Sequence, residues 1–397
     1  MDTAKLQAWW AHRQGLDGSL AGKSAAEVLE RTGWTRSVGG SGPYIGLFAR
    51  AGLSRAAIDE ALARTEIHEL PSARGCTHVL PAAHFALGLK AGQGATNADM
   101  RTALKLGVTE KEVEKLCDAV LRALRSGGPL DPEQIREATG GAARSLGPEG
   151  QKKGMTSTLP LALGRLQESG DIRRIPVNGR IDQQRYRYAL WDPNPLSGYK
   201  LNQEEAATEL ARLYFRWIGP ATLSEFQWFS GLGVKAAKAA VTPLKLIEID
   251  TQSGRWMHDF DVDEFERFTA PKKPNYSLIS SLDGLTLLRR DVSLLISNDD
   301  RQRQVPVEKG VASLGGLADL PCHAIADRGR VAGLWEFDTR SNAIAWISFG
   351  KADKAMKEAV ARMEAFVRDD LGDARSFSLD SPKSRAPKID ALLKMKS

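Results

Sequence analysis

IRRIPVNGRIDQQRYRYAL, residues 172–190, predicts a β-hairpin. Residues 172–177 are mostly apolar or β-branched, which favours a strand, and Asn178-Gly179 is typical of a tight two-residue turn. In the return strand the tyrosines alternate with arginines, which places Arg185 and Arg187 together on one face. The hairpin therefore has an apolar face for packing and a basic face for solvent or a ligand.

Three predicted helices precede this hairpin. Asp131-Pro132 begins a helix that runs to Thr139, a short helix follows around Ala142, and residues 155–169 form the third. Three helices followed by a hairpin is the order of a winged helix, whose third helix enters the major groove of DNA. The sequence therefore predicts a winged-helix module.

The same order recurs in the next part of the chain. Helices are expected over residues 203–217, 223–229 and 234–241, and residues 244–258 predict a second hairpin. This copy carries Lys235 and Lys238 on its third helix but few cations on its hairpin. The modules are therefore expected in tandem, with the first one more basic.

The remaining segments complete a fold class that is mainly α with β-hairpin wings (α+β). Strands are expected over residues 277–288, 294–296, 331–337 and 343–349, followed by a helix over residues 351–371. The expected domains are 1–128, helical or winged-helix; 129–192, the basic winged helix; 193–270, the second winged helix; 271–375, a β-rich domain with a closing helix; and 376–397, a basic tail that is extended or disordered.

Positive charge is concentrated in two places. The chain has a net charge of +6, whereas residues 151–190 alone carry eight Lys/Arg against three acids, and the tail from Lys383 carries five against one. Such focused charge favours a nucleic-acid partner, although a solvated basic face used for protein contacts has the same composition. The expected DNA contacts are Lys152, Lys153, Thr156, Ser157, Thr158, Arg173, Arg174, Arg180, Arg185 and Arg187.

Other classes of protein are disfavoured. No run of about 18 apolar residues predicts a membrane span. Cys76, Cys117 and Cys322 are scattered without a Cys-x-x-Cys pair, so we expect neither a structural zinc nor another metal, and no cofactor. These features predict a monomeric cytoplasmic protein associated with the nucleoid and with double-stranded DNA.

Two segments of the N-terminal region are candidates for a site. A Gly-rich loop with Arg36, Ser37, Gly39, Gly40 and Tyr44 is expected to line a cleft, or else to pack under an aromatic core. Glu66, Glu69 and His78 offer carboxylates and an imidazole for acid–base chemistry, or else belong to an edge hairpin with surface charges. Both interpretations of each segment stay open.

The chain resembles the AlkZ/YcaQ-like superfamily of tandem winged-helix proteins. The matching segments are residues 43–50, 73–81, 214–222, 225–228 and 331–335, in the same order over nearly the whole chain. The resemblance implies winged-helix units and a C-terminal β-rich domain wrapped around duplex DNA. It also implies a glycosylase that removes alkylated bases or unhooks crosslinks, using a Gln-x-Gln or Gln-x-Asp pair shortly before the segment that matches Pro43-Tyr44.

At that position this chain departs from the pattern. The pair falls on Arg36 and Val38, and no Gln, Asp or Glu lies between Thr32 and Phe48. We therefore expect a DNA-binding protein on a glycosylase-like scaffold that recognises damaged or alkylated DNA. The alternatives are an active monofunctional glycosylase that uses other residues, with Glu66, Glu69 and His78 as candidates, and a protein whose N-terminal cleft binds an alkylating small molecule.

Overall fold

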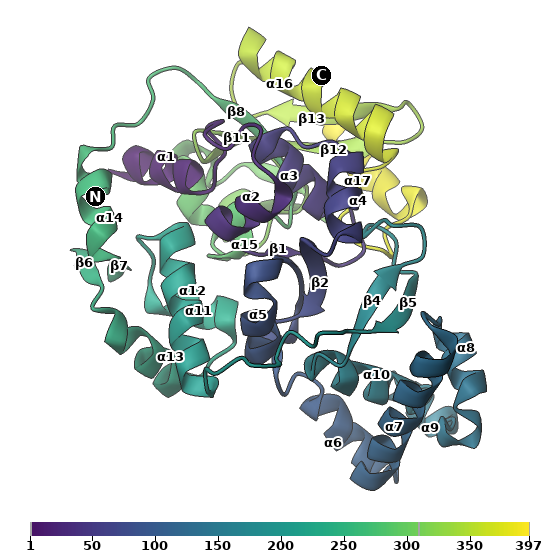
Figure 1. Cartoon of the computed structure of the whole chain (residues 1–397). Coiled ribbons are helices and arrows are strands. Elements are labelled where there is room, and N and C mark those ends of the chain that lie inside the picture. Colours follow the sequence, from purple (N-terminus) through teal and green to yellow (C-terminus); the bar gives the residue numbers. More distant parts are fainter. Residues whose placement is uncertain (1, 309, 397) are drawn as a thin grey trace.

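The computed structural model describes residues 2–308 and 310–396, and a four-stranded antiparallel sheet lies in the upper part of the molecule as drawn in Figure 1. The sheet has the order β13-β12-β11-β8, with β8 at Tyr276–Ile279, β11 at His323–Asp327, β12 at Arg330–Asp338 and β13 at Ala343–Ser348. Its apolar side chains contribute to two separate cores. The N-terminal helices and the C-terminal strands therefore form one continuous body.

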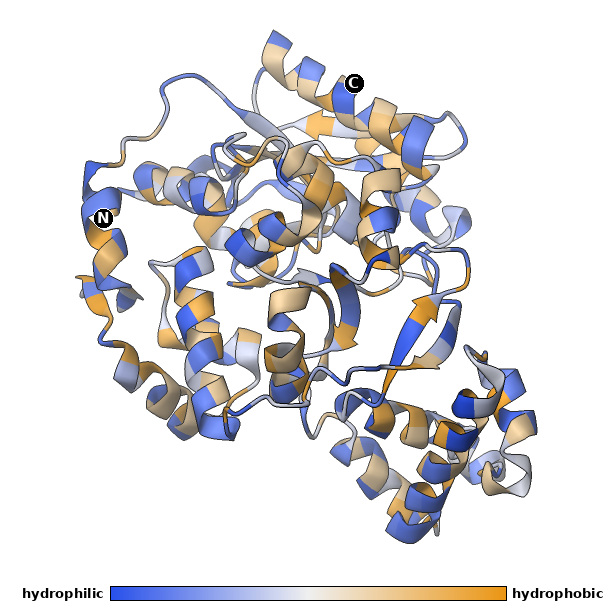
Figure 2. Cartoon of the chain, in the orientation of Figure 1, coloured by the Kyte–Doolittle hydropathy of each residue, from blue (hydrophilic) through white to orange (hydrophobic). Residues whose placement is uncertain are grey.

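Helices cover the two faces of this sheet. Trp9 and Trp10 of α1 (Thr3–Arg13) are completely buried in one core, and α16 (Lys354–Phe366) packs into the other. Figure 2 shows hydrophilic and apolar residues alternating along α16, as expected of a helix that buries one face. A π-helical turn, Val367–Leu371, extends α16 to the end predicted from the sequence.

Serine side chains begin two of the N-terminal helices. The side chains of Ser24 and Ser54 cap α2 (Ala25–Thr32) and α4 (Arg55–Ala63), and α3 (Gly42–Ala51) lies between them. A small sheet in the order β1-β3-β2 follows, with β1 at Thr35–Arg36, β2 at Ile67–Pro71 and β3 at Thr77–Pro81, and α5 (Phe85–Gly92) packs on it. This small sheet carries three of the N-terminal candidate residues, Arg36, Glu69 and His78.

The basic unit is a helical cluster with one hairpin, and it projects from the rest of the molecule (Figure 1). Its elements are α6 (Asn97–Lys105), α7 (Glu110–Gly127), α8 (Pro132–Ala138), α9 (Gly147–Lys152), α10 (Leu159–Glu168), β4 (Ile172–Pro176) and β5 (Tyr186–Leu190). These elements share one apolar core, in which Val120 and Leu163 are buried. That core joins α6 and α7 to residues 130–190, whereas the sequence placed them in the first unit.

The tight turn predicted at Asn178-Gly179 is wrong. The strand ladder ends at Pro176 opposite Tyr186, so residues 177–185 form a long connection. Ile181 of this connection is fully buried in the N-terminal core, where its backbone N–H donates to Tyr44 Oη at 3.2 Å. Burial of an apolar side chain stabilises a long, docked loop instead of a solvent-exposed two-residue turn.

The following unit has the predicted element order. It contains α11 (Gln203–Ile218), α12 (Leu223–Ser230), α13 (Val234–Val241), β6 (Ile247–Asp250), β7 (Arg255–Met257) and then α14 (Asp259–Arg267). Capping boxes at Asn202 and Thr222 start the first two helices. The α+β fold class is confirmed, while the assignment of these units as winged helices stays a prediction.

Two strands predicted in the C-terminal region are helical instead. The predicted strand 277–288 ends with β8, and α15 (Gly284–Leu287) follows because Asp283 accepts a hydrogen bond from the Leu285 N–H and caps it. Residues 292–295 form a 3-10 helix capped by Asp291, where a strand was expected over 294–296. β11 was not predicted, and the short strands β9 (Gln304–Pro306) and β10 (Val311–Ser313) pair apart from the main sheet.

The tail predicted to be extended or disordered is instead a helix, α17 (Pro382–Lys396). It packs on β13 and β12, and Ile389 and Leu392 are buried against them. Arg385 is also buried and donates to Asp373 at 2.6 Å. The spacing of these apolar residues gives the helix a buried face, which the high charge of the tail concealed.

Along the described ranges, no helix is long and apolar enough to cross a membrane.

Candidate functional site

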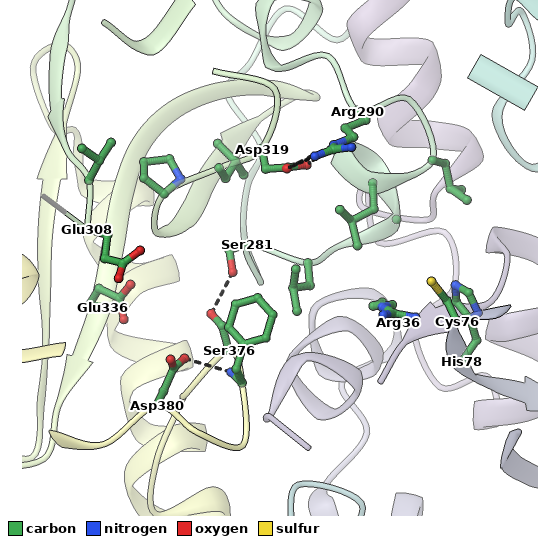
Figure 3. Close-up of a pocket in the computed structure, with 18 of the residues that line it drawn as sticks. Arg36, Cys76, His78, Ser281, Arg290, Glu308, Asp319, Glu336, Ser376 and Asp380 are labelled. Carbon is green, nitrogen blue, oxygen red and sulfur yellow. Dashed lines mark hydrogen bonds and ion pairs between the residues drawn. The ribbon is translucent and has the colours of Figure 1, made fainter. Parts of the chain in front are cut away.

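A cavity of about 880 Å³ lies between the small N-terminal sheet, α12 and the C-terminal region (Figure 3). Arg36 and His78 line it from β1 and β3, and Trp228 lines it from α12. The opposite wall comes from residues 281–290, 307–308, 319–321 and 376–388 together with Glu336 of β12. Segments that are far apart in the sequence therefore meet in one pocket.

The Gly-rich loop is a packed connection at the edge of this cavity. Of its predicted cleft residues, Arg36 lines the cavity, whereas Ser37, Gly39, Gly40 and Tyr44 are buried outside its lining. A Cβ at Gly40 would lie 2.1 Å from the carbonyl oxygen of Ser376, so no larger residue fits there. The loop thus fixes the position of Arg36.

The C-terminal segment that leads into α17 covers this loop. Ser41 N–H donates to the Arg375 carbonyl oxygen at 2.9 Å, and Ser378 N–H donates to the Val38 carbonyl oxygen at 3.1 Å. Ser376 also shares a hydrogen bond of 2.8 Å with Ser281, which Figure 3 shows as a dashed line. Three regions of the chain are therefore joined at the position where the resemblance places the catalytic pair.

The acid–base candidates do not form one site. Glu66 is exposed and lies 3.9 Å from Arg64, whereas Glu69 is buried and accepts a hydrogen bond from Ser37 Oγ. In the ladder His78 is opposite Leu70, the residue after Glu69, so the strand alternation directs Glu69 and His78 to opposite faces of the sheet. His78 lines the cavity, whereas Glu69 is not among the residues that line it.

His78 is a neutral group at physiological pH. Burial, and then the positive charge of Arg36, lowers the pKa of His78 to about 3. Its Nδ1 lies 2.9 Å from Ser72 Oγ, and its ring contacts Trp34 and Phe229. A neutral imidazole can exchange hydrogen bonds with a ligand but contributes no positive charge.

The other side of the cavity carries carboxyl groups. In Figure 3 Glu308, Glu336 and Asp380 lie across the pocket from Arg36, Cys76 and His78. Burial raises the pKa of Glu336 to about 7, against the opposing effect of Lys388, whose Nζ lies 3.6 Å from Glu336 Oε1. Glu336 therefore changes its charge near neutral pH.

Sequence reasoning missed Glu336. It lies in the strand Arg330–Asp338, directly after the matching segment 331–335, and its neighbours are mostly apolar. A lone carboxylate within an apolar strand is the signal that would have identified it, since such groups are rarely buried without a partner or a function.

The predicted DNA-contact residues divide into two groups. Lys152, Lys153, Thr156, Arg185 and Arg187 are exposed, and Lys152 forms an ion pair with Glu149. The others are partly or fully buried and make contacts within the protein. Thr158 bonds the Arg144 N–H, Arg173 and Arg174 reach Thr65 and Thr77, Arg180 pairs with Asp182, and Ser157 forms a bridge with Ser145.

Comparisons with known proteins agree with this architecture. Residues 37–367 match the model of the family described as DNA glycosylase AlkZ-like. Among solved structures, the chain is similar to the Streptomyces sahachiroi DNA glycosylase AlkZ, with a TM-score of 0.68 and 18% identity over 94% of this chain and 98% of that one. A search of curated proteins found no match.

Proposed function

The chain belongs to the AlkZ-like family of DNA glycosylases, and from this premise we propose that it binds duplex DNA and recognises alkylated nucleotides in it. In this proposal the protein acts as a monomer near the nucleoid. The cavity receives the altered nucleotide, and exposed cations of the basic unit hold the backbone of the duplex. Recognition does not use the Gln pair of the family.

The observation that carries this proposal is the position of Arg36. It lies on the cavity wall where the resemblance places the first residue of the catalytic pair, and Val38 takes the second position. A guanidinium repels the positive charge that develops on the sugar when a glycosidic bond breaks, and a valine side chain cannot hold the attacking water. Arg36 instead suits a phosphate group of the strand that enters the cavity.

The grip on the duplex is assigned to the exposed cations of the basic unit. Lys153, Arg185 and Arg187 are exposed, and no described residue forms an ion pair with them. If the unit acts as a winged helix, α10 faces the major groove and the hairpin follows the backbone. The docked tip at Ile181 fixes the orientation of that hairpin relative to the cavity.

The test is a fluorescence-anisotropy titration of a labelled duplex at several KCl concentrations. We expect measurable affinity at low salt and a log–log plot whose negative slope reports the phosphates contacted. Absence of duplex affinity at low salt would overturn the proposal.

Glu336 favours a second function, hydrolysis of the glycosidic bond. A cavity carboxylate can accept a proton from water as the water oxygen bonds to the anomeric carbon and the alkylated base departs with the bonding electrons. The pKa of about 7 gives Glu336 an ionised fraction at neutral pH. Abasic sites formed in duplexes with N3- or N7-alkylated purines, and abolished by Glu336→Gln, would establish this function; no release across a lesion panel would exclude it.

A further inference from the structure

Two guanidinium groups enclose the indole of Trp228 at the cavity wall. The Arg74 guanidinium carbon lies 3.1 Å from the ring centroid and that of Arg290 lies 4.0 Å from it. With two guanidinium groups this close to the ring, a base has no room to stack on Trp228. The indole therefore serves to hold two cations at fixed positions.

These cations have too few anionic partners. Arg290 forms an ion pair with Asp319 at 3.0 Å, but Arg74 has neither a hydrogen-bond acceptor nor an ion-pair partner among residues 2–308 and 310–396. In the same ranges, Arg36 donates to the Thr77 carbonyl oxygen at 3.3 Å and pairs with no carboxylate. Desolvation lowers the pKa of Arg74 and Cys76 opposes this, while the charges of Arg290 and Arg36 lower it further and Asp319 opposes them. The three guanidinium groups are therefore close enough to repel one another, with Asp319 as the carboxylate that acts on Arg74.

The arrangement is held in place by the backbone. Arg74 has a φ of 59°, in the left-handed region, within the 3-10 turn that joins β2 to β3. Gly231, the C-cap of α12, faces it so closely that a Cβ there would lie 3.0 Å from the Arg74 Cα. The turn and α12 therefore fit together in one way, which places Arg74 over Trp228 before any ligand binds.

We propose that Arg36, Arg74 and Arg290 form a phosphodiester-binding site on the cavity wall, in which Trp228 orients two of the three guanidinium groups. The site rests on the proposed function, because the phosphodiester is that of the DNA strand whose nucleotide enters the cavity. The planar guanidinium groups of Arg36 and Arg74 can each donate two parallel N–H bonds to phosphate oxygens, whereas Arg290, whose Nε and Nη2 already donate to Asp319, adds positive charge. The bound phosphate supplies the negative charge that the protein lacks there.

The experiment compares the salt dependence of duplex binding by wild type, Arg74→Gln and Arg362→Gln. Arg74 is exposed, so its replacement removes a charge without opening the core. Arg74→Gln should reduce the slope of log K against log[KCl] by about one, the value for a lost phosphate contact. Arg362 lies exposed on α16, away from the cavity, and its replacement should leave the slope unchanged.

A third variant, Arg74→Lys, separates charge from geometry. It should keep the slope of wild type but bind severalfold more weakly, because an ammonium group neither stacks on the indole as a plane nor donates in a fork. If wild type binds duplex and Arg74→Gln has the same slope of log K against log[KCl] as wild type, the phosphodiester-binding site is refuted. The proposed function is not affected by that result.

Two further titrations decide the remaining outcomes. If duplex does not bind, the proposed function fails, and a labelled (dT)10 strand then tests the phosphodiester-binding site alone. Binding of this strand that is weakened by Arg74→Gln supports the site, and absence of binding overturns it. Inorganic phosphate is then added at constant ionic strength to distinguish a strand from a free anion. Failure to displace the oligonucleotide supports the strand, whereas displacement at micromolar phosphate would identify a free-phosphate site and overturn the assignment.

Discussion

The buried pair Arg50–Asp283 links the N-terminal helices to the C-terminal domain at the scale of single residues. Nη1 and Nη2 of Arg50 each donate to a carboxylate oxygen of Asp283 at 2.7 Å, and both side chains are almost completely buried. Asp283→Ala should lower the free energy of unfolding by about 3–5 kcal/mol, because it leaves a buried guanidinium uncompensated. Urea unfolding measures this loss, and a stability equal to that of wild type would refute the role of the pair. The exposed pair Arg368–Asp369 offers a control, Asp369→Asn.

Glu336 makes stability depend on pH. Its pKa is raised from 4.5 to about 7 by burial, so between these values the folded state holds a proton that the unfolded chain has released. The free energy of unfolding should therefore decrease as pH rises from about 4.5 to about 7. Glu336→Gln should reduce this decrease in urea titrations at several pH values, whereas the exposed Glu308→Gln should not. Equal pH profiles for wild type and Glu336→Gln would contradict the assignment.

At the scale of elements, α17 belongs to the fold and forms part of the cavity wall. Two adjacent leucines test this, since Leu392 is fully buried and Leu393 is 45% exposed. Leu392→Ala should lower the free energy of unfolding by about 2–5 kcal/mol, and Leu393→Ala should have little effect. Equal effects of the two substitutions would show that the helix does not pack on the sheet in solution.

The β4–β5 hairpin is the element assigned to grip the DNA backbone. Arg185→Gln and Arg187→Gln should each reduce the salt slope of duplex binding by about one, since each removes one exposed cation. Arg180→Gln is the informative comparison, because Arg180 already pairs with Asp182 and donates to the Leu371 carbonyl oxygen. If the salt slope of duplex binding is unchanged in both hairpin variants, the DNA backbone is bound by another surface.

At the scale of the whole molecule, local signals in the sequence predicted the elements but not how they assemble. Ser24, Ser54 and Thr109 mark helix starts because a cap acts within one turn. Asp283-Gly284 has the composition of a hairpin turn as well as that of a helix start, and the pairing of Asp283 with the distant Arg50 could not be read from the sequence. Likewise, the sheet that buries Ile389 and Leu392 is formed by residues far from the tail.

The candidate site was predictable only in part for the same reason. Arg36 and His78 were each identified from their own segment, and the pairing of β1 with β3, which the sequence did not predict, brings them together. The proximity of Glu69 and His78 in sequence was misleading, since strand alternation separates their side chains. Trp228, Arg290 and Glu336 reach the cavity from three other regions, so no local pattern connects them.

Recognition of an alkylated nucleotide is tested by a paired titration with two duplexes of identical sequence, one of which carries a single N7-alkylated guanine. If the cavity accepts an altered nucleotide, the alkylated duplex should bind more tightly than the unmodified one at the same salt concentration. Because backbone contacts are the same in both duplexes, the difference isolates recognition of the lesion. Equal affinity for the two duplexes would contradict the proposal that the cavity accepts an alkylated nucleotide.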